Sequence, residues 1–394
     1  MKYCFSTRTI NARPSDIREL TKAITERGLI SFAGGNPDPA LFPIEAIQKS
    51  VKEILEEDGK QALQYGPTEG YRPLREYISK VSMATAGVTN VTPDQIQIVN
   101  GSQQGIDLLC KAFLDKGDVV ICERPTYSGL INATRAYECR YCDIPVEADG
   151  MRMDLLEETL KREPRAKFIY TIPDFQNPSC GVMSLEKRKQ LLALSCRYHV
   201  PIIEDGPYSE ICFGSKLPSI KSLDTSNAVI YLGSFSKILS PGLRTAWICA
   251  TPEIIRLTTI FRQGTDLQSS SLDQRIVMRY MQENDHKAHV AMLVEKYRVK
   301  CNVMMDAIRA AFPESVRYVQ PQGGFFTWLT FPERVRITDI LPKIMEAGVA
   351  IVPGRGFFAT PGGDQNARLS YITESDARIV EGIDKLSKVL RQYC

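Results

Sequence analysis

The stretch Val229-Ile-Tyr-Leu-Gly-Ser-Phe-Ser-Lys-Ile-Leu-Ser-Pro-Gly-Leu-Arg244 decides the fold class of this sequence. Its first four residues are apolar, and Gly, Ser and Lys follow closely. A short apolar run that ends in this way predicts a buried strand with polar groups at its carboxyl end. Ligands of open parallel sheets bind beyond such strand ends. The stretch therefore predicts an α/β sheet with a ligand beside Ser234, Ser236, Lys237 and Arg244.

The same pattern occurs four more times upstream of this stretch. Short apolar runs occupy residues 97–100, 119–122, 168–172 and 200–203, and each is followed by polar, Gly or Pro residues. Helical periodicity separates the runs, for example in the apolar stripe from Ile106 to Phe113. Strands that alternate with helices predict a buried, mostly parallel sheet.

The length of the chain, 394 residues, is too great for one ordinary core and fits a large domain plus a smaller one. Helical character dominates residues 252–312, and the residues after them return to mixed α and β. We therefore expect a large α/β domain over residues 46–270. A smaller α+β domain would combine both chain termini, residues 1–45 and 271–394.

The composition argues against several classes of partner. Apolar residues make up 43% of the chain and charged residues 24%, which is typical of a globular protein with a sizeable core. A net charge of +3 is too small to indicate nucleic acid or membrane as a partner. No apolar run reaches the roughly 18 residues that span a bilayer, and the first residues lack the apolar stretch of a signal peptide.

The eleven cysteines are scattered without the spacing of a disulfide framework, which predicts a reducing compartment and a cytoplasmic protein. One Cys-x-x-Cys occurs, at Cys139 and Cys142, but it lies in a strand-like run and no second pair completes a metal site. His286 and His289 are spaced for one helix face without further ligands, and we interpret them as exposed helix residues. No metal is expected.

The residues that follow the predicted strands offer a set of complementary chemical groups. They are Gly101, Ser102, Gln103, Tyr127, Asn177, Asp205, Tyr208, Ser234, Ser236 and Lys237. Together they provide a lysine amine, a carboxylate, an amide, aromatic faces and groups that can donate hydrogen bonds to a phosphate. Pyridoxal 5′-phosphate (PLP) needs an amine for its aldehyde, an acid beside its ring nitrogen, an aromatic face and a phosphate cradle. PLP is therefore the expected cofactor.

Five of these residues have predicted contacts with the ring of the cofactor. Lys237 would form a Schiff base with the aldehyde, and Asp205 would pair with the protonated ring nitrogen. Tyr208 and Asn177 can both donate to the phenolate oxygen, and Tyr127 can stack on the ring. Asp205 could instead be a helix cap, and Tyr127 could be a packing aromatic.

The remaining residues predict a phosphate site. Gly101, Ser102 and Gln103 open a helix, whose free N–H groups and dipole favour an anion. Ser102 and Gln103 could also be only a cap and a first-turn residue. Arg244 supplies a planar guanidinium that is always charged and can make two hydrogen bonds to a phosphate. The hydroxyls of Ser234 and Ser236 would complete the set of phosphate-binding groups.

These motifs resemble those of the class I and II aminotransferases of PLP fold type I. The resemblance lies in the lysine stretch and in Phe175-Gln-Asn-Pro178, Glu204-Asp-Gly-Pro-Tyr208 and Gln64-Tyr-Gly-Pro-Thr-Glu-Gly-Tyr-Arg-Pro-Leu-Arg75. The motifs occur in the family's order over nearly the whole chain. Asp16-Ile-Arg-Glu-Leu20 and Ser31-Phe-Ala-Gly-Gly35 are most similar to the aminoadipate/kynurenine-type group and to the aminotransferase domain of MocR-type regulators. Cys180 and Gly206 depart from the family pattern, which puts substrate preference in doubt more than activity.

The resemblance implies further site residues. Arg368 matches the arginine that binds the substrate α-carboxylate, and Gly35 matches a glycine that lets the substrate approach the backbone. Tyr65 matches a tyrosine that contacts the phosphate of the neighbouring subunit, which implies a homodimer with shared active sites. Arg18 could contact the distal acid of a dicarboxylic substrate, or it could equally be a surface helix residue.

The implied activity is transfer of an amino group between an amino acid and a 2-oxo acid by a ping-pong PLP mechanism. Lys237, Asp205 and Tyr208 would be its catalytic residues. One alternative is a PLP-dependent lyase, by β-elimination or decarboxylation, because the same motifs serve those reactions. The other is a non-catalytic, ligand-sensing relative. The physiological donor and acceptor are not decided by the sequence.

Overall fold

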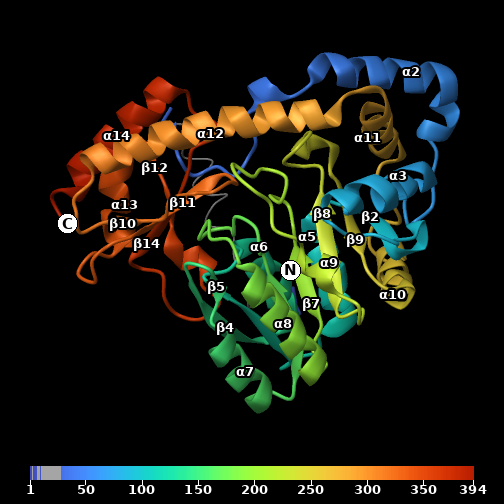
Figure 1. Cartoon of the computed structure of the whole chain (residues 1–394), viewed down its shortest axis with the longest axis horizontal. Coiled ribbons are helices and arrows are strands. Elements are labelled where there is room, and N and C mark those ends of the chain that lie inside the picture. Colours follow the sequence, from blue (N-terminus) through green and yellow to red (C-terminus); the bar gives the residue numbers. More distant parts are fainter. Residues whose placement is uncertain (2, 7–8, 10–27) are drawn as a thin grey trace.

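The computed structural model describes residues 1, 3–6, 9 and 28–394 (Figure 1). Its centre is an eight-stranded sheet with the spatial order β2-β9-β8-β7-β6-β3-β4-β5. In that order the strands are Ile96–Asn100, Thr245–Cys249, Val229–Ser234, Ile202–Asp205, Ala166–Thr171, Val119–Arg124, Arg140–Glu147 and Gly150–Met151. The five predicted apolar runs all coincide with strands of this sheet, and the α/β class is confirmed.

One part of the sheet differs from the prediction of parallel strands. The neighbours β8, β7, β6, β3 and β4 pair in parallel, but β9 runs antiparallel to β8 and to β2. The connection from Ser234 to Thr245 is too short for the helical crossover that a parallel neighbour would need. The chain therefore returns directly alongside β8, and β9 separates β2 from the parallel strands.

Most strands of this sheet are buried on both faces. On β3, Val120 and Cys122 belong to one buried cluster, whereas Val119 and Ile121 belong to another. Successive side chains of a strand point to opposite faces, so both faces of the sheet are core. The helices of this part are α5 (Ser102–Phe113), α6 (Ser128–Thr134), α7 (Met153–Arg162), α8 (Leu185–Tyr198), α9 (Ile220–Leu223) and α10 (Pro252–Gln263).

The C-terminal part contains a second, antiparallel sheet with the order β10-β11-β14-β13. Its strands are Arg317–Tyr318, Phe326–Thr330, Asn366–Ser370 and Val352–Pro353. β1 (Ile30–Ser31) pairs in parallel with β12 (Val349–Ala350), so the first described residues of the main segment join the C-terminal part. The helices here are α12 (His286–Ala311), α13 (Ile337–Glu346) and α14 (Asp376–Leu390). The domain limits at residues 46 and 270 stay a prediction.

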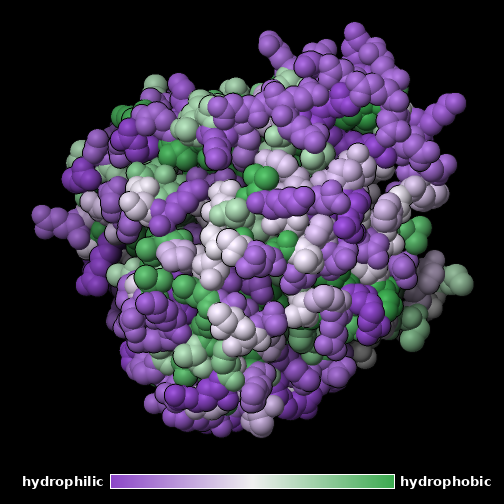
Figure 2. Space-filling model, turned by 45° about the vertical axis from the view of Figure 1, so that its right-hand side comes forward, coloured by the Kyte–Doolittle hydropathy of each residue, from purple (hydrophilic) through white to green (hydrophobic). Residues whose placement is uncertain are grey.

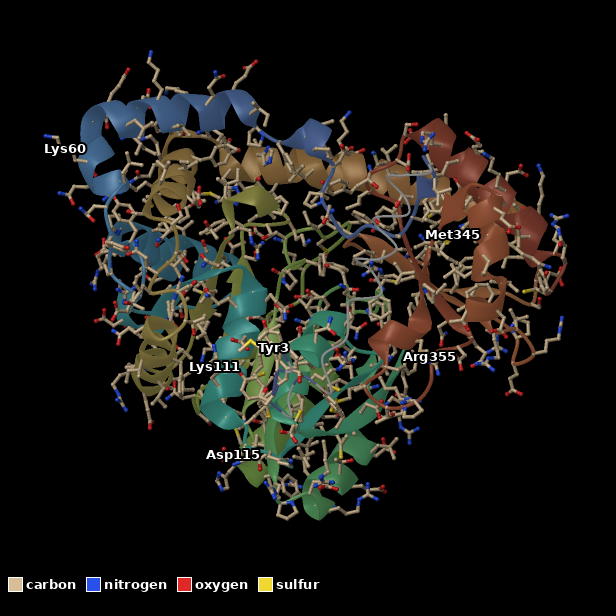
Figure 3. The ribbon with its side chains drawn as sticks, turned by 180° about the vertical axis from the view of Figure 1, so that it is seen from behind. Tyr3, Lys60, Lys111, Asp115, Met345 and Arg355 are labelled. Carbon is tan, nitrogen blue, oxygen red and sulfur yellow. The ribbon has the colours of Figure 1, made fainter. Side chains whose placement is uncertain are left out.

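The remaining helices are α2 (Ile44–Ala62), α3 (Arg72–Tyr77), α4 (Met83–Thr85) and α11 (Ser271–Glu283). α2 packs on α11, and in the view from behind Lys60 of α2 lies far from Arg355 of the C-terminal part (Figure 3). The face drawn in Figure 2 is mainly hydrophilic, with apolar residues dispersed over it. None of the helices in the described ranges has the length and apolar character needed to cross a membrane.

Candidate active site

A cavity of about 550 Å³ lies at the carboxyl ends of the central strands. Thirteen of the predicted site residues line it: Gly35, Gly101, Ser102, Gln103, Tyr127, Asn177, Asp205, Tyr208, Ser234, Ser236, Lys237, Arg244 and Arg368. Most of them follow strands of the large sheet, whereas Arg368 comes from β14 in the C-terminal part. The cavity therefore needs both parts of the molecule.

Lys237 follows β8 and is half-buried in this cavity. Its amine lies 5.9 Å from the ring centroid of Tyr208 and 5.6 Å from that of Phe325. Burial, and then the positive charges of two nearby arginines, lower the pKa of Lys237 to about 8. At pH 7 roughly a tenth of the amine is then unprotonated, which is the form that a nucleophile or a general base requires.

Asp205 is the last residue of β7 and is 2% exposed. Its Oδ2 accepts a hydrogen bond from the Tyr170 hydroxyl at 2.6 Å, whereas its Oδ1 has no partner among the described residues. Burial raises the pKa of Asp205 to about 6, although the Tyr170 hydrogen bond opposes this. A buried acceptor without a partner is costly, so Asp205 Oδ1 is suited to a ligand N–H. The protonated ring nitrogen of PLP fits this position.

Several groups that can donate hydrogen bonds to an anion lie where α5 begins. Gly101 has a φ of +80°, and a Cβ at this position would collide with the Arg244 guanidinium, so only glycine fits. Arg244 also has a left-handed backbone, with a φ of +46°, which is uncommon for a residue with a side chain. The hydroxyl of Ser234 donates to that of Ser236 at 2.9 Å. A helix N-terminus, two hydroxyls and a guanidinium together suit a phosphate.

Tyr127 and Gln103 form one wall of the cavity. The Tyr127 hydroxyl donates to Gln103 Oε1 at 3.4 Å, and Gln103 Nε2 donates to the Gly129 carbonyl oxygen at 2.8 Å. Burial raises the pKa of Tyr127 to about 12, so its hydroxyl stays protonated near neutral pH. The Gln103 side chain is therefore held by protein atoms, and its backbone N–H in the first turn of α5 is the group that can meet an anion.

Arg368 is a buried cation that contacts Asn177. It is 3% exposed and donates to Asn177 Oδ1 at 2.7 Å and to the Ala33 carbonyl oxygen at 2.9 Å. Its Nε has no partner, and no acid of the described ranges pairs with it. The guanidinium stacks on Phe326, 4.0 Å from the ring centroid. A buried charge of this kind needs an anion, and a substrate carboxylate fits its fork.

Tyr65 is 78% exposed and is outside the cavity of this chain, which is compatible with a contact to a second subunit but does not test it. Arg18 lies outside the described residues, and its predicted substrate contact stays a prediction. Gly35 lines the cavity, and its carbonyl oxygen accepts a hydrogen bond from the Lys237 amine at 2.9 Å.

Sequence reasoning missed several lining residues, among them Ser128, Asn132 and Ile172. Ser128 and Asn132 are four apart in α6, on one helix face directly after Tyr127, and this spacing could have indicated them. Ile172 directly follows β6. Its apolar side chain gave no chemical signal.

The interpretation of His286 and His289 as exposed residues was wrong. Both are partly buried in the first turn of α12, and His286 Nε2 lies 3.8 Å from Glu210 Oε2. Cys139 and Cys142 are free thiols, and the described residues contain no group of three or more potential metal ligands. Gly206 is required locally, because a Cβ there would lie against the Tyr231 hydroxyl.

Comparison with known proteins places this chain in a family. The aminotransferase class I and II family matches residues 27–386. The 2-aminoadipate transaminase of Thermus thermophilus is 41% identical, over 96% of this chain and 94% of its own length. The crystal structure of Pyrococcus horikoshii kynurenine aminotransferase with PMP superposes with a TM-score of 0.95 at 37% identity, over 98% of this chain and 97% of that one.

A regulator also matches, but less closely. The HTH-type transcriptional regulator YdfD of Bacillus subtilis is 28% identical over 95% of this chain and 77% of its own length. The more similar relatives are aminotransferases, which favours amino-group transfer over the lyase and the ligand-sensing alternatives. From the length of the match and the cavity that the motifs form, the chain belongs to the class I and II aminotransferases.

Proposed function

We propose that this chain is a PLP-dependent aminotransferase in which Lys237, Asp205 and Arg368 divide the chemistry between cofactor and substrate. One observation carries the proposal. A single cavity contains an amine with a lowered pKa, together with a buried carboxylate oxygen and a buried arginine that have, respectively, no hydrogen-bond donor and no acid among the residues that the structure describes. The three groups meet the separate needs of an aldehyde, a ring nitrogen and a substrate carboxylate.

The residues that would hold the cofactor surround the cavity. Asp205 would accept from the ring nitrogen, Tyr208 and Asn177 would contact the phenolate oxygen, and Tyr127 would stack on the ring. Gly101, Ser102, Gln103, Ser234, Ser236 and Arg244 would bind the phosphate. When bound, PLP supplies an aldehyde that takes up the amino group and a ring that delocalises electrons from the substrate α-carbon.

The protein's own residues would orient the substrate and move the proton. Arg368 would bind the α-carboxylate of either the amino acid or the 2-oxo acid, and Asn177 fixes one side of its guanidinium. This contact would place the α-carbon beside Lys237. The unprotonated Lys237 amine would then act as the general base that takes the α-proton. Asp205 would keep the ring nitrogen protonated throughout the reaction.

The substrate class follows from the cavity and the relatives. The carboxylate site at Arg368 suits any α-amino acid. The relatives are named for 2-aminoadipate and for kynurenine, which are an acidic and an aromatic amino acid. We extend that range to this chain, with a 2-oxo acid as the acceptor.

We also propose a homodimer with shared sites, in which the exposed Tyr65 of one chain contacts the phosphate of the other. The exposure of Tyr65 supports this arrangement, since 78% of its surface is accessible. The cysteines support the proposal of a cytoplasmic location. All eleven are free thiols, and free thiols persist in reducing compartments.

An absorption spectrum of the purified protein tests the function. We expect a visible band of protein-bound PLP that a productive amino acid removes and a 2-oxo acid restores. The Lys237→Ala variant should show neither change with the same amino acid. Absence of a PLP band even after adding PLP would contradict the cofactor assignment. Formation of ammonia and a 2-oxo acid, without pyridoxamine phosphate, would indicate a lyase instead.

A further inference from the structure

Glu123, at the end of β3, is a buried carboxylate next to the active site. It is 2% exposed, and no lysine or arginine of the described ranges pairs with it. Its oxygens accept three hydrogen bonds, from the Thr171 hydroxyl at 2.7 Å, the Ile172 N–H at 3.2 Å and Gln176 Nε2 at 3.1 Å. All three donors belong to the segment that leaves β6. Burial raises the pKa of Glu123 to about 7, so maintaining its charge is costly.

The side chain of Gln176 connects Glu123 with the backbone that follows Asn177. Its Nε2 donates to the Pro125 carbonyl oxygen at 2.7 Å as well as to Glu123, and its Oε1 accepts from the Ser179 N–H at 2.7 Å. The side chain therefore connects the end of β3 with the backbone after Asn177.

The segment around Asn177 needs such support because its backbone is strained. Phe175 and Cys180, which flank it, have left-handed φ angles of +50° and +54°. Conformations of this kind persist only where surrounding contacts hold them. Asn177 in turn accepts from Arg368 at 2.7 Å and lies 3.5 Å from the Tyr208 hydroxyl. A shift of Asn177 would displace the guanidinium that is assigned to the substrate carboxylate.

We propose that Glu123 is a positioning residue that sets the affinity for the substrate carboxylate through Gln176, Asn177 and Arg368. Glu123 does not line the cavity. The proposal rests on the assignment of Arg368 as the carboxylate site, and it adds a residue that no cavity contact would indicate.

Glu204 offers a matched control. It is also a buried acid at a strand end, 1% exposed, with a pKa raised by burial to about 7. Its oxygens accept from the backbone N–H groups of Ile220 at 2.9 Å and Lys221 at 2.7 Å, which begin α9 and not the Asn177 segment. The two acids share burial and chemistry, but only Glu123 is connected to Arg368.

The test measures binding and turnover of the holoenzyme with the amino acid found productive above. Binding uses the α-methyl analogue of that amino acid, which has no α-proton to lose, and its Kd is measured by calorimetry. For Glu123→Ala we expect Kd and KM to rise about tenfold or more, with a smaller fall in kcat, because misplacement at a distance weakens carboxylate binding. Glu204→Ala should leave both within about twofold of wild type.

Two further variants keep the test decisive. Glu123→Gln retains one acceptor oxygen and should recover most of the lost affinity. Gln176→Ala breaks the connection without removing the buried acid, and it carries the test if Glu123→Ala does not fold. Equal Kd values for wild type, Glu123→Ala and Gln176→Ala would overturn the proposal, as would an equal loss in Glu204→Ala. A wild-type protein that no amino acid converts would instead contradict the proposed function, before any variant is compared.

Discussion

Arg368 combines full burial with an unpartnered Nε and a stacking contact on Phe326. Such an arrangement is stable only if an anion completes it in the working enzyme. The same logic applies to Asp205, whose Oδ1 lacks a donor. At the scale of single residues, these unpartnered atoms therefore point to a ligand more directly than the identities of the residues do.

Replacing Arg368 should affect substrate binding most. For Arg368→Ala we expect KM for the amino acid to rise roughly 30-fold or more, because a buried charge contact with the α-carboxylate is lost. kcat should fall less. Arg355→Ala is the control, since Arg355 is exposed and its ion pair with Asp364 is loose, at 3.9 Å. Steady-state kinetics at saturating oxo acid measures both, and an unchanged KM would move the carboxylate site elsewhere.

The lowered pKa of Lys237 predicts how its reactivity depends on pH. Burial and the neighbouring arginines disfavour the ammonium form, so the amine should become reactive as pH rises through about 8 and not through the ordinary lysine value of 10.5. Brief labelling of the cofactor-free protein with an amine reagent, followed by peptide mass spectrometry, gives this midpoint. Lys189, which is exposed on α8, is the control, because its labelling shows how the reagent reacts with an ordinary lysine at each pH. A labelling midpoint of Lys237 near 10.5 would contradict the lowered pKa of its amine.

Gly101 should tolerate no side chain. In Gly101→Ala the new Cβ would meet Arg244 and the residue would keep a left-handed φ, so we expect PLP affinity to fall by about tenfold or more. Fluorescence titration of the cofactor-free protein with PLP measures this change. Gly264→Ala is the control, because its φ is −86° and its nearest contact is ordinary. Equal affinity in both variants would argue against a phosphate at this helix end.

The charged residues of the cavity could be predicted from the sequence. A lysine, an aspartate and an arginine that each follow a predicted strand occur together in few kinds of ligand site. Ile172 lines the cavity without any such signal. The role of Glu123 was not predictable either, because its acceptor contacts depend on a backbone path that no periodicity describes. Tyr65 and Arg18 stay predictions.

At the scale of elements, α8 illustrates how a single buried arginine holds a loop. Arg188 is fully buried and donates to the carbonyl oxygens of Met183, Pro218 and Pro173 and to the Asp174 carboxylate. Three of these acceptors lie between β6 and α8 and the fourth lies just before α9, so one side chain connects the segment around Asn177 with the segment that precedes α9.

Removing this side chain should lower stability. For Arg188→Leu we expect a loss of about 3 kcal/mol or more in the free energy of unfolding, because a buried acid and three carbonyl groups lose their donor. Arg197→Leu, on the same helix, should cost less than about 1 kcal/mol, since its ion pair with Glu157 is exposed. Denaturant unfolding of both variants gives the comparison. Equal losses would show that burial of Arg188 is not the cause.

The sequence predicted elements well where hydrophobic periodicity was regular. The helical stripe predicted from Ile106 to Phe113 belongs to α5, Ser102–Phe113, and the long helical region after Pro252 comprises α10, α11 and α12. β9, which runs antiparallel to both of its neighbours, was not predicted. The short connection from Ser234 to Thr245 makes β9 return alongside β8, and this direction could not be predicted while β9 itself was not recognised as a strand.

At the scale of the whole molecule, the proposed dimer predicts complementation between inactive subunits. If Tyr65 serves the partner's site, a hybrid of Tyr65→Ala and Lys237→Ala chains has one intact site, built from the wild-type parts of both chains. Random mixing in equal amounts makes half of the dimers hybrids, so we expect about a quarter of wild-type activity. Activity assays after joint refolding or co-expression measure it. No gain over the two separate variants would place Tyr65 within its own subunit's site or outside any site.

The two-part organisation was predicted from the length of the chain and from the return to a mixed α and β pattern after residue 312. The pairing of β1 with β12 agrees with a part formed by both ends of the chain. Its limits could not be taken from the sequence, because α12 extends over 26 residues along the molecule without a break (Figure 1).

The cavity takes residues from Gly35 to Arg368, and this spread has a consequence for biosynthesis. A nascent chain still lacking β14 already contains Lys237 and Asp205, yet it has no arginine for the substrate and no closed wall. A nascent chain without Arg368 cannot hold a substrate carboxylate in this cavity, so we expect amino-group transfer only after β14 has left the ribosome and joined the fold.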